Sequence, residues 1–268
     1  MMPLLRSWDV GTARDPARRA GLVIGLAQLP LRPLVRLLSR PQWQGTENFP
    51  ASGAVIACGN HLSAFDPFGY GHLLQASGIA PRFLAKESLF RVPVLGALLR
   101  SARQIPVLRG TSRSGDALDA AREALGRGEL LMVFPEGTYT RDPELWPMQA
   151  RLGAARLALS TGAPLLPIAT WGGRGLWPVG SPLPRPGRGR RVRMRVGAPY
   201  TVAIGEGETE HEAALRITED LMARIAALLG ELRGLTPPDH LHDPRTDAHR
   251  PEIGRTDPGF RAPTEPRR

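Results

Sequence analysis

Five short, mostly apolar runs recur through the middle of the chain, each bounded by glycine, proline or charged residues. Runs of this length and content are typical of buried β-strands. They are Ala54–Cys58, Arg82–Ala85, Gln104–Leu108, Leu130–Phe134 and Pro164–Thr170. Between them, helical spacing of apolar residues occurs in Phe68–Ala76, Ser114–Arg127 and Arg151–Ser160. Strands that alternate with helices form a largely parallel sheet with helices on both faces, so we predict an α/β fold.

Two further elements follow the fifth apolar run. Residues Arg191–Val196 alternate arginine with valine and methionine, which is the pattern of a half-buried strand. Residues Glu208–Leu229 have the spacing of a long amphipathic helix. From Leu235 onward the chain is rich in proline, aspartate, histidine and arginine and poor in apolar residues, so we predict that residues 235–268 are disordered. Residues 45–234 therefore form one predicted domain.

Residues 1–44 differ from the predicted domain in their pattern. The apolar stretch Ala20–Leu31 is 12 residues long, whereas a membrane-spanning helix needs about 20. Leu31–Arg40 places Arg32, Arg36 and Arg40 on one helical face, which indicates an amphipathic helix lying in a membrane interface. A surface helix packed on its own domain fits this pattern equally well. Neither interpretation includes a transmembrane span, and no small-residue cleavage pattern indicates a secretory signal.

The formal net charge of the chain is +10, and the first 45 residues carry seven arginines against two aspartates. A basic segment favours an anionic partner. Membrane lipid fits better than nucleic acid, because aromatic residues make up only 6% of the chain and do not interleave with the basic ones. We therefore expect a membrane surface as partner and no nucleic acid. The expected location is the cytoplasmic face of the plasma membrane, with peripheral or monotopic attachment.

Cysteine and lysine are both represented by a single residue. Cys58 is the only cysteine, which excludes an internal disulfide and a cysteine-based zinc site, and we expect it to be a buried, inert thiol. Lys86 is the only lysine in a chain that otherwise uses arginine, so it is a candidate for a specific contact. No pattern of metal-ligating residues is evident, and neither a metal nor a cofactor is expected.

The stretch from Gly59 to Pro67 follows the first predicted strand and contains both His61 and Asp66. Asp66 and Pro67 have the features of a helix start, with Asp66 as cap, so His61 lies in a strand-to-helix loop. Catalytic groups concentrate in such loops. A carboxylate five residues on can hold one ring nitrogen and leave the other free to take a proton. Taken alone, the pair is equally consistent with an ordinary helix cap beside an unrelated histidine.

Polar residues of unlike chemistry also follow three other predicted strands: Lys86, Arg109 and Glu136. The carboxyl ends of parallel strands meet at one edge of the sheet, and the ligand crevice lies there. Folding alone does not call for four such groups at that edge. We therefore predict a catalytic site centred on His61.

Four ordered blocks resemble those of the glycerolipid acyltransferases, most closely the 1-acylglycerol-3-phosphate O-acyltransferases. They are Asn60-His61 with Asp66, Ile105-Pro106-Val107 with Arg109, Phe134-Pro135-Glu136-Gly137-Thr138, and Leu166-Pro167-Ile168. Phe83–Lys86 and Gly153–Ala158 are also similar to the family, so the resemblance covers about residues 45–200. In one departure, Arg151 stands where the family usually has a lysine.

The resemblance implies transfer of a fatty acyl group from coenzyme A or acyl carrier protein to the free hydroxyl of 1-acylglycerol-3-phosphate. The product would be phosphatidic acid, in phospholipid biosynthesis. His61 would be the general base and Asp66 the residue that orients it. The implied substrate-binding residues are Arg109, Glu136, Gly137, Thr138, Lys86 and Arg141. Main-chain N–H groups near Asn60 or Gly137 would stabilise the oxyanion.

Three other functions stay open at this point. One is an acyltransferase of the same fold that acts on another lysolipid or on a glycolipid. Another is a hydrolase of acyl thioesters or lysolipids that uses the His–Asp pair, although Arg109 and Glu136 argue against it. A membrane-associated scaffold without activity is the third, and the intact pair of His61 and Asp66 argues against it.

Overall fold

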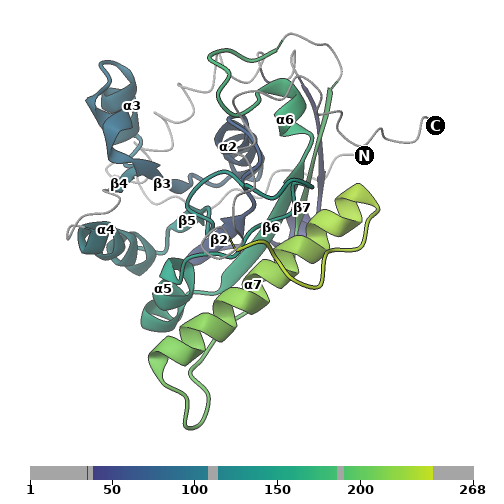
Figure 1. Ribbon diagram of the computed structural model, residues 1–268. Helices are drawn as coiled ribbons and strands as arrows, with labels where there is room; N and C mark the ends of the chain where they lie inside the picture. Colours follow the sequence, from purple (N-terminus) through teal and green to yellow (C-terminus); the bar gives the residue numbers. More distant parts are fainter. Residues whose placement is uncertain (1–34, 36–38, 108–113, 186–189, 244–268) are drawn as a thin grey trace.

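The computed structural model describes residue 35 and residues 39–107, 114–185 and 190–243, and the described strands form one seven-stranded sheet (Figure 1). The strands are β1 (Ser39–Gln44), β2 (Val55–Gly59), β3 (Arg82–Lys86), β4 (Ile105–Val107), β5 (Leu130–Val133), β6 (Leu165–Trp171) and β7 (Arg190–Val196). The α-helices are α2 (Asp66–Ala76), α3 (Leu95–Ser101), α4 (Ser114–Gly126), α5 (Gly153–Thr161), α6 (Gly173–Leu176) and α7 (Glu210–Arg233). Two short 3-10 helices are η1 (Thr46–Asn48) and η2 (Glu87–Arg91).

The order of strands across the sheet is β1-β7-β6-β2-β5-β3-β4. Within this described sheet, only the β6–β7 pair is antiparallel, and every other neighbouring pair is parallel. The carboxyl ends of β2, β3, β4, β5 and β6 therefore meet at one edge. The predicted α/β fold with a largely parallel sheet is confirmed, and β2 and β5 are direct neighbours at its centre.

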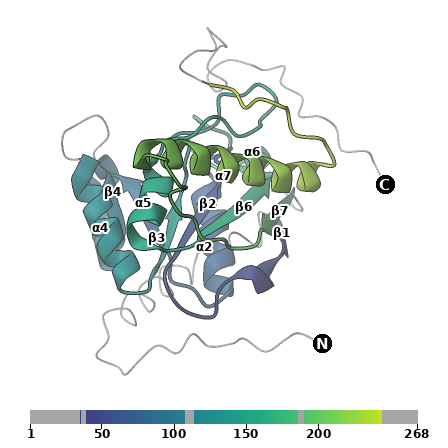
Figure 2. The same cartoon turned by 90° about the horizontal axis from the view of Figure 1, so that it is seen from below.

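Helices cover both faces of the sheet (Figure 2). On one face α2 packs Tyr70, Leu73 and Leu74 against the strands. On the other face α4, α5 and α7 enclose a larger cluster of buried apolar side chains. Strands β2 and β5 are buried along their whole length because both faces are covered, which explains why they read as continuous apolar runs.

Strand β1 lies where the sequence pattern predicts a helix ending at Arg40 and a connector from Trp43, so this part of the prediction is wrong. The strand is mostly polar in sequence, contains Pro41, and has only one buried residue, Ser39. It forms the edge of the sheet, where a proline without an N–H donor is tolerated. Apart from Val35 and the start of β1, the predicted amphipathic segment lies outside the described residues.

Helix α7 confirms the predicted long amphipathic helix. A capping box fixes its start, because Thr209 and Glu212 each accept a main-chain N–H from the other. Gly234, in the left-handed conformation at φ 68°, ends it. Within the described residues, no helix, α7 included, has both the length and the apolar content needed to cross a bilayer.

The chain after α7 folds back onto the domain. The main-chain N–H of Gln149 donates to the carbonyl oxygen of His242 at 2.9 Å, and both His242 and Asp243 are buried. Leu241 packs against the larger apolar cluster. The predicted disorder is therefore wrong for residues 235–243, whereas residues 244–268 lie outside the described part of the chain.

Candidate active site

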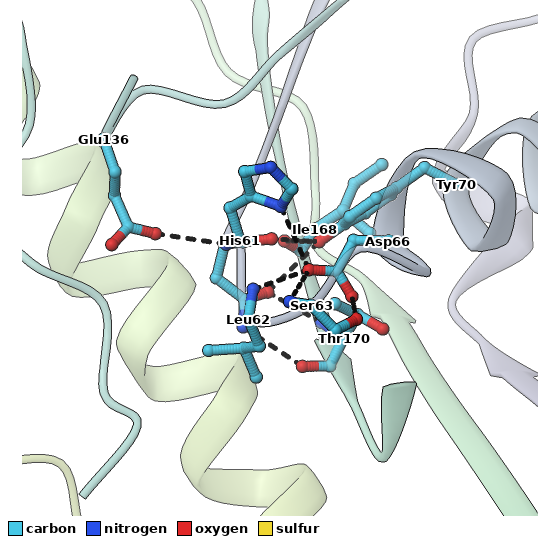
Figure 3. Close-up of polar contacts among 9 residues, drawn as sticks. His61, Leu62, Ser63, Asp66, Tyr70, Glu136, Ile168 and Thr170 are labelled. Carbon is cyan, nitrogen blue, oxygen red and sulfur yellow. Dashed lines mark hydrogen bonds and ion pairs between the residues drawn. The ribbon is translucent and has the colours of Figure 1, made fainter. Parts of the chain in front are cut away.

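His61 and Asp66 lie in and directly after the loop that joins β2 to α2, and their side chains face each other (Figure 3). The Nδ1 atom of His61 is 3.1 Å from Oδ2 of Asp66. The carboxylate is 1% exposed and the imidazole 12%. A carboxylate at Nδ1 holds the proton on that nitrogen and leaves Nε2 free to accept one. The structure thus brings the two predicted residues together in the geometry of a base and its orienting acid.

Three further donors fix the Asp66 carboxylate. They are the main-chain N–H groups of Leu62 and Ser63, at 2.5 and 2.7 Å, and the Ser63 hydroxyl, at 2.6 Å. A buried carboxylate needs such partners to offset its lost hydration. Phe65, not Asp66, is the N-cap of α2, so the prediction that Asp66 caps the helix is wrong. Because the Ser63 hydroxyl donates to Asp66, Ser63 is held as a structural group.

Asn60, directly before His61, ties the loop to β6. Its Nδ2 donates to the Thr170 carbonyl at 3.1 Å, and the Thr170 N–H donates back to Oδ1 at 2.8 Å. The Tyr70 hydroxyl from α2 donates to the Asn60 carbonyl at 3.2 Å. Gly59 allows this approach, since a Cβ there would lie 2.4 Å from the Tyr70 hydroxyl oxygen. These contacts fix the backbone from which His61 projects.

Two aromatic rings enclose the imidazole of His61. Phe134 stacks on it with ring centroids 4.1 Å apart, and Tyr139 lies 4.2 Å away at a tilt of 42°. Both belong to the segment that follows β5. Sequence reasoning missed both residues, although they immediately flank the Pro135–Thr138 stretch of the third block. The rings limit rotation of the imidazole and partly exclude water from it.

Glu136 lies behind the His61 backbone. Its Oε1 accepts the main-chain N–H of His61 at 3.1 Å, and its Oε2 accepts that of Met148 at 3.0 Å. The residue is 5% exposed, and burial raises the pKa of its carboxyl to about 8, although the two N–H donors oppose that shift. Thr140 adds a bond from its N–H to the His61 carbonyl at 2.8 Å. The carboxylate expected to bind substrate is therefore occupied by main-chain donors and positions His61.

A cavity of about 810 Å³ opens beside His61. Of the predicted substrate-binding residues, Lys86, Gly137 and Thr138 line it. Arg141 is exposed and does not line it, and Arg109 lies outside the described residues. The rest of the lining is mainly apolar and includes Phe83, Leu89, Leu95, Leu98, Leu118 and Leu157. Such a lining suits a hydrocarbon chain.

Arg151 also lines the cavity, next to Gly137. A Cβ on Gly137 would lie 3.1 Å from the Nε atom of Arg151, and the φ of 69° at Gly137 favours glycine as well. The N–H of Gly137 donates to the Phe134 carbonyl at 2.9 Å, so the expected role of that N–H in stabilising an oxyanion is not supported. Arg151 and Lys86 are the two cationic residues among the described lining. Each of them can pair with an anionic group that enters the cavity.

Other reactive groups do not form a second centre in the described part of the chain. No group of three or more histidine, cysteine, aspartate or glutamate residues there could hold a metal ion. Cys58 is buried in β2, and its burial raises the pKa of the thiol well above its usual value. The thiol therefore stays protonated and unreactive, as predicted.

Comparisons with known proteins point to one family. A family model described as Acyltransferase matches residues 40–171. A chloroplastic 1-acyl-sn-glycerol-3-phosphate acyltransferase of Brassica napus is 33% identical over 140 residues, which cover 52% of this chain and 39% of that protein. A 1-acyl-sn-glycerol-3-phosphate acyltransferase of Borreliella burgdorferi is 32% identical over 128 residues, which cover 47% of this chain and 49% of that protein. The matches thus span about two-fifths to one-half of the length of these relatives.

A solved structure agrees with these matches. The crystal structure of the 1-acyl-sn-glycerophosphate acyltransferase PlsC from Thermotoga maritima aligns with a TM-score of 0.62 and 26% sequence identity. The alignment covers 84% of this chain and 86% of that one. The similarity therefore extends over most of the fold, beyond the residues that the family model matches.

Proposed function

We propose that this chain, whose residues 40–171 match the acyltransferase family model, transfers a fatty acyl group to the free hydroxyl of 1-acylglycerol-3-phosphate. The product is phosphatidic acid. The donor is an acyl thioester of coenzyme A or of acyl carrier protein. The observation that carries the proposal is the His61–Asp66 pair at 3.1 Å, with His61 in the lining of a cavity whose other side chains are mainly apolar.

The acyl transfer is a nucleophilic substitution at the thioester carbonyl. Nε2 of His61 takes the proton of the acceptor hydroxyl while its oxygen attacks the carbonyl carbon. Asp66 stabilises the imidazolium that forms. The C–S bond then breaks, and the leaving thiolate takes the proton from Nε2. The new ester and a free thiol are the products, and a base positioned in this way contributes about 10²–10⁴-fold to the rate.

The phosphate of the acceptor is assigned to the cationic residues of the cavity lining. Lys86 and Arg151 supply positive charge in the described lining. On the strength of the family resemblance, we further assign Arg109 as a contact of the glycerol phosphate and Arg141 as a contact of the phosphate or of the thioester carrier. The acyl chains occupy the apolar remainder, where burial contributes about 0.8 kcal/mol per methylene group.

We also propose attachment to the cytoplasmic face of the plasma membrane. The acceptor is a lipid, and the chain carries a net charge of +10 with an excess of arginine in residues 1–45. Each basic residue near an anionic leaflet contributes about 1 kcal/mol.

An acyl-transfer assay tests the activity. Lysophosphatidate, other lysolipids and a glycolipid are each offered with labelled acyl-coenzyme A and with labelled acyl carrier protein, and products are identified by mass. Labelled phosphatidic acid from lysophosphatidate, absent with His61→Ala, is the expected result. Release of free fatty acid in place of an ester would identify a hydrolase and contradict the proposal.

A further inference from the structure

Helix α3 and the preceding η2 helix form a corner of the molecule rich in exposed apolar side chains. Figure 1 shows α3 standing out beyond β3 and β4. Of the nine large apolar side chains that are exposed among the described residues, five lie in this corner. These are Leu89, Val92, Val94, Leu95 and Leu98, which are 40%, 45%, 84%, 37% and 38% exposed, and we call them the η2–α3 surface. A contiguous group of this kind marks an interaction site more often than isolated exposed residues do.

The backbone at the tip of this surface is strained. Val94 has φ 64° and ψ −58°, and the N–H of Leu95 donates to the Pro93 carbonyl at 2.7 Å, which makes Val94 the centre of a classic γ-turn. This conformation is unfavourable for a β-branched residue. Gly96 lets α3 pack tightly on η2, since a Cβ there would lie 2.1 Å from the Phe90 carbonyl oxygen. The fold therefore holds the apolar side chain of Val94 outward in an unfavourable backbone conformation.

The surface continues into the cavity that contains His61. Leu89, Leu95 and Leu98 are partly exposed to solvent and also line that cavity. An apolar path thus leads from the outside of the molecule to the proposed base. A bulky protein partner seated here would cover the entrance that the substrate needs, whereas a bilayer would supply the substrate through it.

The charges around this surface fit an anionic partner. Residues 86–100 contain Lys86, Arg91 and Arg100 against Glu87 alone, a net charge of +2. Lys86, Arg91 and Arg100 are all exposed. Apolar side chains bordered by cationic ones are the composition of surfaces that insert into the headgroup region of a membrane.

We propose that the η2–α3 surface docks onto an anionic lipid bilayer and admits the lysolipid acceptor to the cavity. This inference rests on the proposed function for the identity of the lipid that enters. The docking itself depends only on the exposed apolar tip and its basic border. Val92 and Val94 insert into the bilayer, and the leucines behind them continue the apolar path to His61.

Vesicle co-sedimentation of the full chain tests the docking, with phosphatidylcholine vesicles that contain or lack phosphatidylglycerol. Val94→Asp and Val92→Glu are the two test variants, because neither residue lines the cavity. Ile204→Asp is the matched control, since Ile204 is 49% exposed and its loop, between β7 and α7, lies well away from α3 in Figure 1. Circular dichroism confirms that each variant folds.

We expect each test variant to bind the anionic vesicles about tenfold more weakly, whereas Ile204→Asp binds as the wild type does. Turnover of detergent-dispersed acceptor should stay unchanged in all three. Unchanged vesicle binding by both test variants would overturn the proposal. If only a variant that lacks residues 1–34 loses vesicle binding, the membrane contact belongs to that segment. Dissociation of a dimer by Val94→Asp would instead assign the surface to a second copy of the chain. If wild-type protein acylates no acceptor but the binding pattern holds, the proposed function fails and the docking stands.

Discussion

Oε1 of Glu136 accepts the main-chain N–H of His61 at 3.1 Å, so an acid that follows β5 fixes the backbone of the proposed base that follows β2. The two residues are 75 positions apart in the chain, and they meet because β2 and β5 are neighbours in the sheet. The second oxygen of Glu136 accepts the N–H of Met148. Glu136 therefore fixes the main chain on both sides of the site, at His61 and at Met148.

Glu136→Gln should change both the rate and the pH dependence of stability. An amide offers one acceptor oxygen to two main-chain donors, so one buried N–H loses its partner, at a cost of about 1–3 kcal/mol. We expect kcat to fall more than KM changes, because the backbone of His61 is displaced while the cavity is kept. Steady-state kinetics and denaturant unfolding measure the two effects.

The sign of the pH effect follows from the raised pKa of Glu136. Burial raises it from 4.5 in the unfolded chain to about 8 in the folded protein, so the folded state holds the extra proton between these values. The contribution to stability is complete below pH 4.5 and is lost as pH rises through 8. In that window the free energy of unfolding of wild type should fall relative to Glu136→Gln by up to about 1.4 kcal/mol per pH unit. A constant difference from pH 5 to pH 8 would mean that the carboxylate stays ionised.

His61→Ala and Asp66→Asn should differ in their effect on stability. His61→Ala removes the base and should lower kcat by about 10²–10⁴-fold with little loss of stability, because the imidazole lies in a loop. Asp66→Asn should lower kcat to a similar extent. It should also destabilise the fold, because Leu62 and Ser63 then donate to an amide in place of a carboxylate. Kinetics and thermal unfolding of both variants separate the effects, and a fully active, folded His61→Ala protein would exclude the mechanism.

Arg151→Ala should weaken binding of the phosphorylated acceptor. The Arg151 side chain lines the cavity beside Gly137, and a charge-assisted contact with phosphate contributes about 1.5–3 kcal/mol. We expect KM for lysophosphatidate to rise about tenfold or more, kcat to change little, and Arg151→Lys to recover part of the loss. Monoacylglycerol, which lacks the phosphate, is the control acceptor. An equal rise in KM for both acceptors would show that Arg151 does not contact the phosphate.

The sequence predicted those parts of the fold that depend on local pattern. Strands β2, β5 and β6 are buried on both faces, so their apolar runs identify them directly. The five-residue spacing from His61 to Asp66 spans one loop and the first residue of α2, and this short connection brings the pair together as predicted. Strand β1 could not be predicted in this way, because an edge strand with Pro41 carries neither an apolar run nor a simple alternation.

The sequence pattern does not predict contacts between segments that are distant in the chain. The sequence shows that Glu136 follows the β5 strand, but the direction of its carboxylate depends on which strands are neighbours in the sheet. The stacking of Phe134 and Tyr139 on His61 depends on the path of the loop after β5. Burial of His242 likewise depends on the loop that contains Gln149, not on apolar content near residue 242.

The last prediction concerns Arg233, at the end of α7. Its guanidinium lies between two indole rings, 4.1 Å from the centre of Trp146 and 4.7 Å from that of Trp171. Among the described residues, Nε and Nη1 of Arg233 have no hydrogen-bond partner, and burial lowers the pKa of the side chain. The Trp146 carbonyl accepts the Thr140 hydroxyl at 2.6 Å, and the Thr140 N–H donates to the His61 carbonyl at 2.8 Å. The cation–π contacts therefore help to hold the loop that positions His61.

Arg233→Ala should lower stability by about 1–2 kcal/mol, the range for a desolvated cation–π contact. It should also lower kcat with little change in KM, because the loop at His61 loosens while the cavity lining stays. Arg233→Lys keeps the charge but not the planar stack and should be intermediate. Arg224→Ala is the matched control, because the Arg224 guanidinium lies 4.2 Å from the centre of the Tyr200 ring, in a contact that does not involve this loop. Denaturant unfolding and steady-state kinetics of the three variants measure these effects. An equal loss of kcat in Arg224→Ala and Arg233→Ala would show that the loss comes from lower overall stability and not from the position of the loop.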